Sequence, residues 1–309
     1  MQNSQHSPSN TCSYFVPYTA PYDWTWMTSF LGARALAGIE HFEHHENGAV
    51  TYRRTLSLSV ENENENENEI VTGWLTWQPL PEQNVVALAL SPSLDIHRDA
   101  VIKRVRNLLD LDADPQQIAE TLGPLVGESA GLRLPGAIDS FELTVRAILG
   151  QLVSVKMAAT FCARLAERWG EPINTPFAEL TRLFPTPARI ATLNVDDLRA
   201  IGVQAKRAAC LINVARAVRD GELPLYSIQD TGEGIKQLIA MPGIGAWTAN
   251  YIAMRAWGER DIFLHSDYLI KQRFPNMTPA TINRYAKIWK PWRSYATLLI
   301  WNNANWKPK

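Results

Sequence analysis

The sequence contains few cysteines and no long apolar segment. Its three cysteines, Cys12, Cys162 and Cys210, lie far apart in a chain of 309 residues. Three cysteines cannot form a four-cysteine zinc or iron–sulfur site, and an odd, scattered set disfavours a disulfide scaffold. No run of about 18 apolar residues is present, which excludes a membrane-spanning helix. The first residues lack the basic and apolar segments of a secretory signal, so we expect a cytoplasmic protein with no membrane association.

The chain has almost no net charge, −1 at pH 7, but its charges are unevenly distributed. Residues 1–69 contain three arginines against nine acidic residues, whereas residues 250–309 contain ten Lys and Arg against three acidic residues. A polyanion would therefore meet the C-terminal part more readily than the N-terminal part. The alternative is that these charges belong to ordinary solvated helix faces.

The N-terminal third has a mixed pattern. Asp23 can cap a helix, and three β-prone runs follow at residues 49–60, 70–80 and 85–91. The acidic repeat at 61–69 contains only Glu and Asn, so it cannot join a core and is typical of a loose hairpin tip. The segment HFEHHE (41–46), read as a helix, places His41 and His45 on one face. We favour a solvated helix end over a metal site there, because nothing nearby completes one.

From about residue 95 onward the pattern is helical, with Gly and Pro marking the breaks. The fold class is therefore α+β: an N-terminal mixed α/β domain with an antiparallel sheet, residues 1–115, precedes an all-helical region. Helices are expected near residues 97–110, 115–122, 139–149, 153–169, 195–200, 205–219, 233–240, 246–257, 267–273, 279–288 and 291–302.

The segment 234–257 carries the most informative motif. A helix is followed by a turn with Pro242, Gly243 and Gly245, and a second helix begins after it. Two glycines let the backbone turn tightly and approach another molecule closely. The unpaired N–H groups of the turn and of the following helix N-terminus suit a phosphate oxygen. A tight connection between helices with no ligand is the alternative.

An aromatic stripe and a carboxylate follow this turn. Trp247 and Tyr251 share one face of the second helix, a pattern also typical of a core. Asp267 stands at or near the start of another helix, where a simple N-cap would explain it. The helix dipole favours a negative charge at that place, which would suit a counter-charge for a cation.

Six ordered blocks of sequence stand out along the chain. They are PYDWTWM (21–27), GLRLPG (131–136), RAILGQLVSV (146–155), PGIG with WTANY (242–251), DYLIKQRFP (267–275) and WKPWRSYA (289–296). Together these blocks resemble the bacterial 3-methyladenine DNA glycosylase II family, within the helix-hairpin-helix DNA glycosylases, from Pro21 to the C-terminus. The resemblance implies two helical subdomains, 116–139 plus 260–309 and 140–259, with the helix-hairpin-helix at 234–257 and the site in the cleft between them.

The resemblance also implies a role for each matching residue. Asp267 matches the catalytic aspartate, and Leu152, with Gln151 before it, matches the wedge that enters the duplex; a core leucine is the alternative. The aromatic positions of the base pocket are Phe30, Trp247, Tyr251 and Trp301. The hairpin that grips the DNA backbone falls on Gly243, Gly245 and Thr248, and main-chain carbonyls of 241–246 could hold a monovalent cation. No other metal, no iron–sulfur cluster and no required cofactor is implied.

These roles describe a monofunctional glycosylase that excises cationic alkylated bases, 3-methyladenine and 7-methylguanine among them, from double-stranded DNA as a monomer. Aromatic faces attract cations, a leucine wedge offsets part of the cost of base flipping, and Asp267 would stabilise an oxocarbenium-like sugar. Trp247 occupies the place where lyase members of the superfamily carry a lysine, so we expect base release without strand cleavage.

Two departures from the family pattern are visible, and two other functions stay open. His265 and Ser266 precede Asp267 where the family often has Pro-Asp, and Asn302 follows Trp301 where an aromatic residue is common. A helix-hairpin-helix protein that binds damaged DNA without catalysis is the first alternative. An 8-oxoguanine lyase is the second, and Trp247 opposes it.

Overall fold

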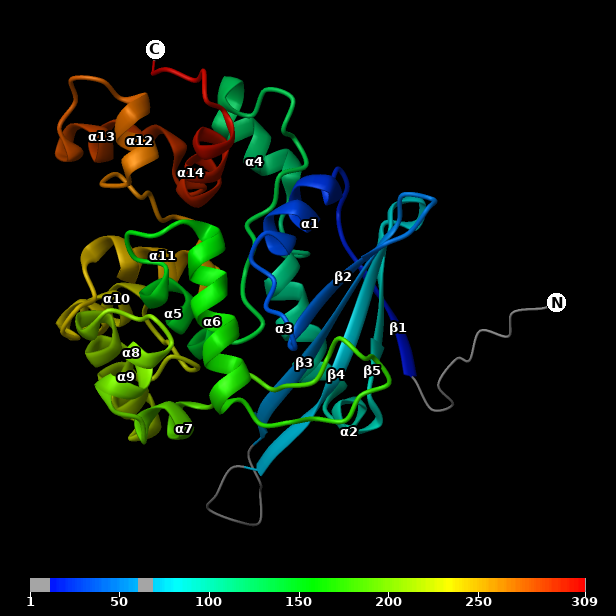
Figure 1. The fold of residues 1–309 in the computed structure, drawn as a ribbon. Helices are drawn as coiled ribbons and strands as arrows, with labels where there is room; N and C mark the ends of the chain where they lie inside the picture. The colour runs from blue at the N-terminus through cyan, green and yellow to red at the C-terminus, as the bar shows by residue number, and fades with distance from the viewer. Residues whose placement is uncertain (1–11, 61–68, 309) are drawn as a thin grey trace. The chain divides into compact units, whose positions relative to one another are not determined.

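The computed structural model describes residues 12–60 and 69–308, so the acidic tract lies outside the described residues except for Glu69 (Figure 1). The chain forms two compact units. Within the described residues, the first unit comprises 12–17, 35–103 and 163–185, and the second comprises 18–34, 104–162 and 186–308. The expected division at 115, 139 and 259 stays a prediction. No helix in the described ranges combines the length and apolar character that crossing a membrane requires.

The first unit contains a five-stranded sheet in the order β1-β5-β4-β3-β2, in which every neighbouring pair is antiparallel. Its strands are β1 (Cys12–Pro17), β2 (Glu40–His44), β3 (Val50–Val60), β4 (Glu69–Leu80) and β5 (Val85–Leu90). Alternation places every second residue of β5 in the core, at Val86, Leu88 and Leu90. The three predicted strands and the α+β class are confirmed.

The helical interpretation of residues 41–46 is wrong, because Glu40–His44 form β2. Phe42 lies opposite Tyr52 of β3, and their ring centroids are 4.7 Å apart. One apolar residue in this segment defines no helical period, so the cross-strand partner decides the structure. His45 faces Thr51 at 2.8 Å (Nε2 to Oγ1). No group of three or more side chains suited to a metal ion occurs among the described residues.

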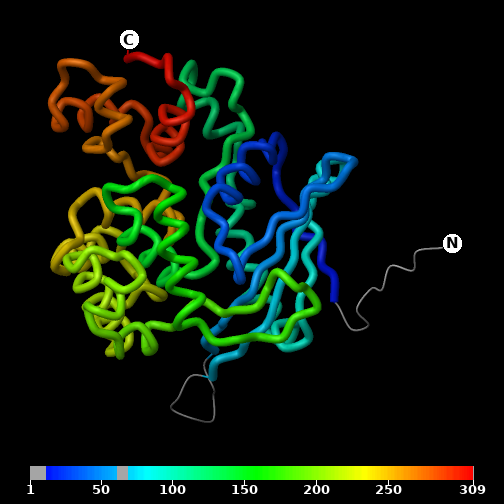
Figure 2. The backbone as a smooth tube through the Cα atoms, in the orientation of Figure 1, coloured from blue at the N-terminus to red at the C-terminus, as the bar shows by residue number. Residues whose placement is uncertain are grey.

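A long segment returns to the sheet after the chain has left the first unit (Figure 2). Thr55 of β3 donates its hydroxyl to the carbonyl of Arg182 at 2.6 Å, and Thr181 N donates to Gly38 O at 2.8 Å. The ring of Phe177 packs edge-on against Trp74 at 5.0 Å. Residues 170–185 therefore belong with the strands although helical sequence surrounds them.

The helices of the C-terminal region lie where the periodicity predicts them. Each helix expected from residue 97 onward is found within two residues of its expected bounds, except that 279–288 ends early and continues as a 3-10 turn. The short helices Pro92–Asp95 and Pro187–Ala191 were not predicted. The helices are α1 (Trp24–Gly32), α2 (Pro92–Asp95), α3 (Arg98–Leu109), α4 (Pro115–Leu122), α5 (Ser140–Leu149), α6 (Val155–Trp169), α7 (Pro187–Ala191), α8 (Val195–Ala200), α9 (Ala205–Arg219), α10 (Thr231–Ala240), α11 (Ala246–Ala256), α12 (Tyr268–Arg273), α13 (Pro279–Tyr285) and α14 (Arg293–Asn302), with 3-10 turns η1 (Pro81–Gln83), η2 (Gly123–Leu125) and η3 (Ala286–Trp289).

Short polar side chains explain many of the helix starts. Asp23 accepts a hydrogen bond from Trp26 N at 2.8 Å, and Asp139 accepts one from Glu142 N at 2.7 Å. Asn194 and Asp197 form a reciprocal capping box at the start of α8. These local contacts satisfy N–H groups that have no partner inside the helix.

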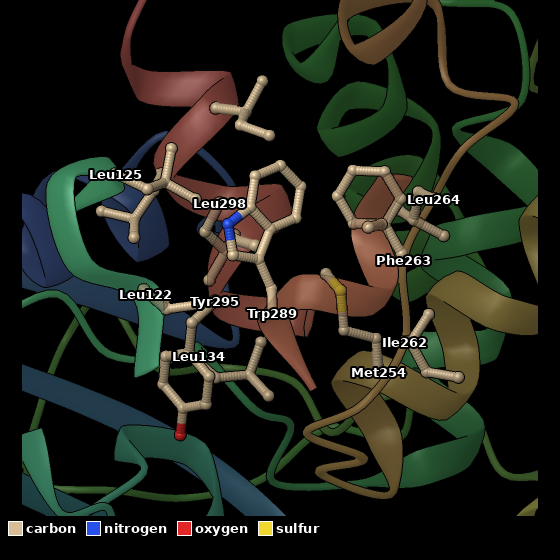
Figure 3. Close-up of a cluster of buried hydrophobic side chains, with 14 of the residues drawn as sticks. Leu122, Leu125, Leu134, Met254, Ile262, Phe263, Leu264, Trp289, Tyr295 and Leu298 are labelled. Carbon is tan, nitrogen blue, oxygen red and sulfur yellow. The ribbon is translucent and has the colours of Figure 1, made fainter. Parts of the chain in front are cut away.

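A large apolar cluster of the second unit holds α12 and α14 in place (Figure 3). Phe263 and Leu264 approach it just before α12 begins, and Ile270 of α12 is fully buried in it. Burial of each such side chain contributes about 1.5–3 kcal/mol. The other labelled members are Leu122, Leu125, Leu134, Met254, Ile262, Trp289, Tyr295 and Leu298.

The GLRLPG block (131–136) packs against residues 19–23, which precede α1 and lie more than a hundred residues earlier in the chain. Arg133 is fully buried and donates to the carbonyls of Ala113 (2.7 Å), Thr19 and Pro21 (3.0 Å). Asp23 N donates to Gly131 O at 2.8 Å, and a Cβ on Gly131 would lie only 2.6 Å from Asp23 N. The close approach requires glycine, so these two blocks of sequence form one structural unit.

A buried carboxyl group links α14 to the same region. Asp110 has φ +51 and accepts hydrogen bonds from Tyr295 (2.6 Å) and from Leu134 N (3.0 Å) at Oδ2. Arg260 approaches its Oδ1 at 3.4 Å. Burial raises the pKa of Asp110 above 3.8, and the bonds from Tyr295 and Leu134 N only partly oppose this effect.

This raised pKa predicts how stability depends on pH. A carboxyl group whose folded pKa is raised contributes stability fully below its unfolded pKa, and that contribution is lost as pH rises through the folded pKa. We expect the unfolding free energy of the wild type relative to Asp110→Asn to fall as pH rises from about 4 to 7. Urea unfolding of both proteins at several pH values measures this difference.

The control is Asp112→Asn, because a hydrogen bond from Arg106 lowers the pKa of that exposed carboxyl group. A lowered pKa gives the opposite slope: the stability is present above the unfolded pKa and is lost as pH falls. Slopes of the same sign for both variants would contradict the assignment.

Candidate functional site

The hairpin between α10 and α11 exposes its backbone. Pro242, Gly243 and Gly245 are exposed, whereas Ile244 is buried and anchors the turn. Gly243 has φ +97, and a Cβ there would lie 2.8 Å from Cβ of Cys210 on α9. A glycine is therefore required at this position for both backbone conformation and packing. A Cβ on Gly245 would meet nothing within 4 Å, so the N-terminus of α11 opens to solvent.

The first N–H groups of α11 are available to an anion. Gly245 is the N-cap residue and supplies no side-chain oxygen to them. Unpartnered N–H groups at a helix N-terminus, together with the helix dipole, form a site that suits a phosphate. Thr248, the third residue of the helix, is buried rather than exposed. The predicted roles of these residues in DNA binding stay predictions.

The turn after α5 presents a fully exposed leucine. Leu152 has a side chain that is 101% exposed and a left-handed backbone with φ +56. The interpretation of Leu152 as a core leucine is therefore wrong. Gln151 points to the hairpin instead: its Nε2 donates to Gly243 O at 3.0 Å and to Thr248 Oγ1 at 3.2 Å. The predicted wedge and the hairpin are thus in direct contact.

Asp267 receives four N–H donors. As N-cap of α12 it accepts from Leu269 N at 2.9 Å and Ile270 N at 3.1 Å, both at Oδ1. The indole of Trp301, on α14, donates to Oδ1 at 3.0 Å. The indole of Trp247, on α11, donates to Oδ2 at 3.0 Å. The N-cap interpretation is correct but incomplete, because two aromatic side chains from other helices also orient this half-buried carboxyl group.

The predicted aromatic residues form a continuous series of contacts that starts at Asp267. Trp247 stacks on Tyr251 with ring centroids 5.1 Å apart and planes 8° from parallel. Phe30, on α1, joins the series through Arg255, whose guanidinium carbon lies 4.8 Å from the Phe30 ring centroid and 5.6 Å from that of Tyr251. The structure therefore brings together Asp267, Trp247, Tyr251, Trp301 and, through an arginine, Phe30.

Sequence reasoning missed two arginines of this site. Arg255 is buried, donates to Tyr251 Oη at 2.7 Å, and binds the carbonyls of Pro135 and Gly136 (3.2 Å for Gly136). Arg34 lies 3.6 Å from the Phe30 ring centroid. Each arginine follows its aromatic partner by four residues, which is the spacing of side-chain neighbours on a helix. That spacing was the signal available in the sequence.

These arginines change the electrostatics of the aromatic residues. Burial lowers the pKa of Arg255 to about 10, so it keeps its charge at neutral pH. Burial alone would raise the pKa of Tyr251, but the charges of Arg255 and Arg34 outweigh it and lower that pKa. Positive charge thus gathers on the Tyr251 side of the Trp247–Tyr251 stack, and the carboxyl group of Asp267 lies on the Trp247 side.

The residues that depart from the family pattern lie beside the site. His265 is half-buried and its Nδ1 lies 3.3 Å from the Phe263 carbonyl. Asp267 N donates to Leu264 O at 2.8 Å, so the turn before α12 is closed by main-chain bonds. Asn302 is exposed at the end of α14. Neither side chain is among the groups that hold Asp267.

Two family models match the chain. Residues 14–139 match the AlkA N-terminal domain, and residues 145–294 match the HhH-GPD superfamily base excision DNA repair protein family. DNA-3-methyladenine glycosylase 2 of Escherichia coli (strain K12) is 43% identical over 295 residues, which cover 96% of this chain and 99% of that protein.

Two further comparisons extend this result. A probable bifunctional transcriptional activator/DNA repair enzyme AlkA of Mycobacterium tuberculosis (strain CDC 1551 / Oshkosh) is 33% identical over 96% of this chain, which spans 58% of that relative. Among solved structures, a 3-methyladenine DNA-glycosylase from Archaeoglobus fulgidus shares the fold, with a TM-score of 0.74, 18% identity, and coverage of 95% of this chain and 98% of that chain.

The E. coli relative matches at high identity along nearly its whole length, and the two family models together account for most of the described residues. The chain therefore belongs to the HhH-GPD superfamily of base excision DNA repair proteins, in the same family as the DNA-3-methyladenine glycosylase 2 of E. coli.

Proposed function

We propose that the protein is a monofunctional DNA glycosylase that excises alkylated bases, 3-methyladenine and 7-methylguanine among them, from double-stranded DNA. The observation that carries the proposal is the carboxyl group of Asp267 held by the indoles of Trp247 and Trp301, beside the Trp247–Tyr251 stack. The proposal also assigns action as a monomer.

Asp267 would act through its charge. Loss of a base from its sugar leaves positive charge on an oxocarbenium-like ring, and a fixed carboxylate nearby stabilises that charge. Four N–H donors engage both carboxyl oxygens, so the group is oriented as a fixed counter-charge rather than left free to take a proton from water. The proposal therefore gives Asp267 the role of electrostatic stabiliser.

The two arginines would favour departure of a cationic base. A methylated purine carries positive charge before the bond breaks, and this charge passes to the sugar as the bond breaks. Arg34 and Arg255, on the Tyr251 side, disfavour the charge on the base, while Asp267, on the Trp247 side, favours it on the sugar. An interaction that improves toward the transition state raises the rate rather than the affinity.

The tryptophan at position 247 supports base release without strand cleavage. Trp247 stands at the position where lyases of the superfamily carry a lysine, and its indole is engaged with Asp267. An indole nitrogen is a hydrogen-bond donor only and cannot form a Schiff base.

A monovalent cation at the hairpin is part of the proposal. The side chains of residues 241–246 carry no oxygen, so only main-chain carbonyls are available there. Uncharged carbonyl ligands suit a weakly held monovalent ion better than Mg²⁺, which is usually bound through carboxylates. Such an ion would place positive charge beside a bound phosphate.

Asp267→Asn tests the catalytic proposal. We expect release of 3-methyladenine from methylated duplex DNA to fall by at least about 10²-fold, since removal of one fixed electrostatic group typically costs that much. Affinity for duplex DNA should change little. Asp196→Asn, at an exposed carboxylate of α8, is the control. Base release by the variant at the wild-type rate would exclude the role, and DNA binding by the wild type without release would favour a non-catalytic damage-binding protein.

The mode of strand processing is tested with the wild-type protein alone. Methylated duplex DNA incubated with the enzyme should contain breaks only after treatment with alkali, because abasic sites would be the product. Denaturing gels of treated and untreated samples measure this. Breaks without alkali, or trapping of the protein on DNA by borohydride, would show a lyase and contradict the proposal.

Arg34→Met tests the proposed charge arrangement. We expect the single-turnover rate on a 7-methylguanine substrate to fall about 10-fold, while affinity for that substrate is unchanged or rises. Arg34→Lys keeps the charge and should retain most of the rate. A wild-type rate for Arg34→Met, or equal losses in both variants, would contradict an electrostatic role.

A further inference from the structure

The exposed leucine stands on a turn with little support of its own. Leu152 occupies the left-handed region, which a branched side chain rarely adopts. Within the turn, Gln151 N donates to Ile148 O at 3.3 Å and Val153 N to Gly150 O at 3.5 Å. These are long bonds, and Val155 and Met157 at the start of α6 are also exposed. Another contact must keep the turn in this conformation.

The side chain of Gln151 provides that contact. Its amide nitrogen donates to Gly243 O at 3.0 Å and to Thr248 Oγ1 at 3.2 Å. Both acceptors are fixed, since Gly243 packs on Cys210 and Thr248 is buried. Gly243 belongs to the hairpin turn and Thr248 to the first turn of α11. One side chain thus connects the leucine turn to the segment whose unpaired N–H groups suit an anion.

We propose that Gln151 is a positioning residue that holds Leu152 at a fixed distance from the hairpin that grips the DNA backbone. The inference rests on the proposed function, because it assumes that Leu152 fills the gap left by a flipped nucleotide. A wedge residue must enter the duplex at a fixed distance from the phosphates that the hairpin binds. Fixing the turn before DNA arrives removes the entropy cost of ordering it on binding.

The chemistry of the contact selects the test variants. Both partners of the amide nitrogen are oxygens, so only a hydrogen-bond donor at the end of the side chain satisfies them. Gln151→Met keeps the length and lacks the donor. Gln151→Glu keeps the shape but directs an oxygen at the Gly243 carbonyl. Gln83→Met, at an exposed glutamine in η1, is the matched control.

The experiment is a double-mutant cycle with Leu152→Ala, read by two signals. One is the single-turnover rate of base release, and the other is the fluorescence of 2-aminopurine placed beside the lesion, which reports unstacking. In the Leu152 background we expect Gln151→Met and Gln151→Glu to lower both signals about 3- to 10-fold, the range of one lost hydrogen bond. In the Leu152→Ala background the same changes should have almost no effect.

Three outcomes overturn the proposal: no effect of Gln151→Met, the same loss with and without Leu152, or a loss explained by a lower melting temperature. The fluorescence signal needs no catalysis. A wild type that unstacks 2-aminopurine but releases no base would therefore refute the proposed function while the Gln151 cycle could still support the positioning role. If the wild type releases base but the effects of the Gln151 and Leu152 substitutions are additive, the proposed function is supported and the positioning role is refuted.

Discussion

Two buried arginines, which join residues 131–136 to other segments through main-chain carbonyls, determine where the site lies in the second unit. Arg133 binds the segment that begins α1, and Arg255 binds the carbonyls of Pro135 and Gly136. Burying a guanidinium is costly unless its donors are paired. Carbonyl oxygens pair both terminal nitrogens of Arg133 without adding a second charge, and its Nε has no hydrogen-bond partner among the described residues. α1, which carries Phe30, and α11, which carries Trp247 and Tyr251, are thereby tied to one short segment.

Arg255 also affects the electrostatics of the site. Arg255 donates from Nη1 to the hydroxyl of Tyr251, so a structural cation sets the charge beside the aromatic stack as well. Asp267 lies beyond Trp247, on the other side of that stack, held by groups from α11, α12 and α14. A substrate between these charges would lie in the field that they set up. Such a field needs no reorganisation during the reaction when the side chains are already paired and packed.

α11 connects the proposed catalytic carboxyl group to the proposed DNA-binding turn. Its N-terminus faces solvent next to Gly245, Trp247 in its first turn reaches Asp267, and Thr248 beside it accepts the amide of Gln151. Consecutive residues of one helix therefore serve the carboxyl group and the leucine turn. The arrangement explains why the hairpin sequence, the aromatic stripe and the LGQLVSV block occur together in this family resemblance.

Local patterns in the sequence determined the helices other than the short α2 and α7, three of the five strands and the α+β class, because caps, glycine breaks and apolar periodicity act over a few residues. They also singled out Asp267, the aromatic set and Leu152, through six blocks of resemblance. The strand at 40–44 was not predicted, because it depends on pairing with β3, where Phe42 lies opposite Tyr52, and periodicity cannot reveal such a partner. Several contacts were not predicted either. They are the hydrogen bond of Gln151 to Gly243, the placement of Arg34 and Arg255 on the aromatic rings, and the four donors around Asp267. Only the tertiary structure decided these, because each joins groups whose approach is set by the packing of whole helices.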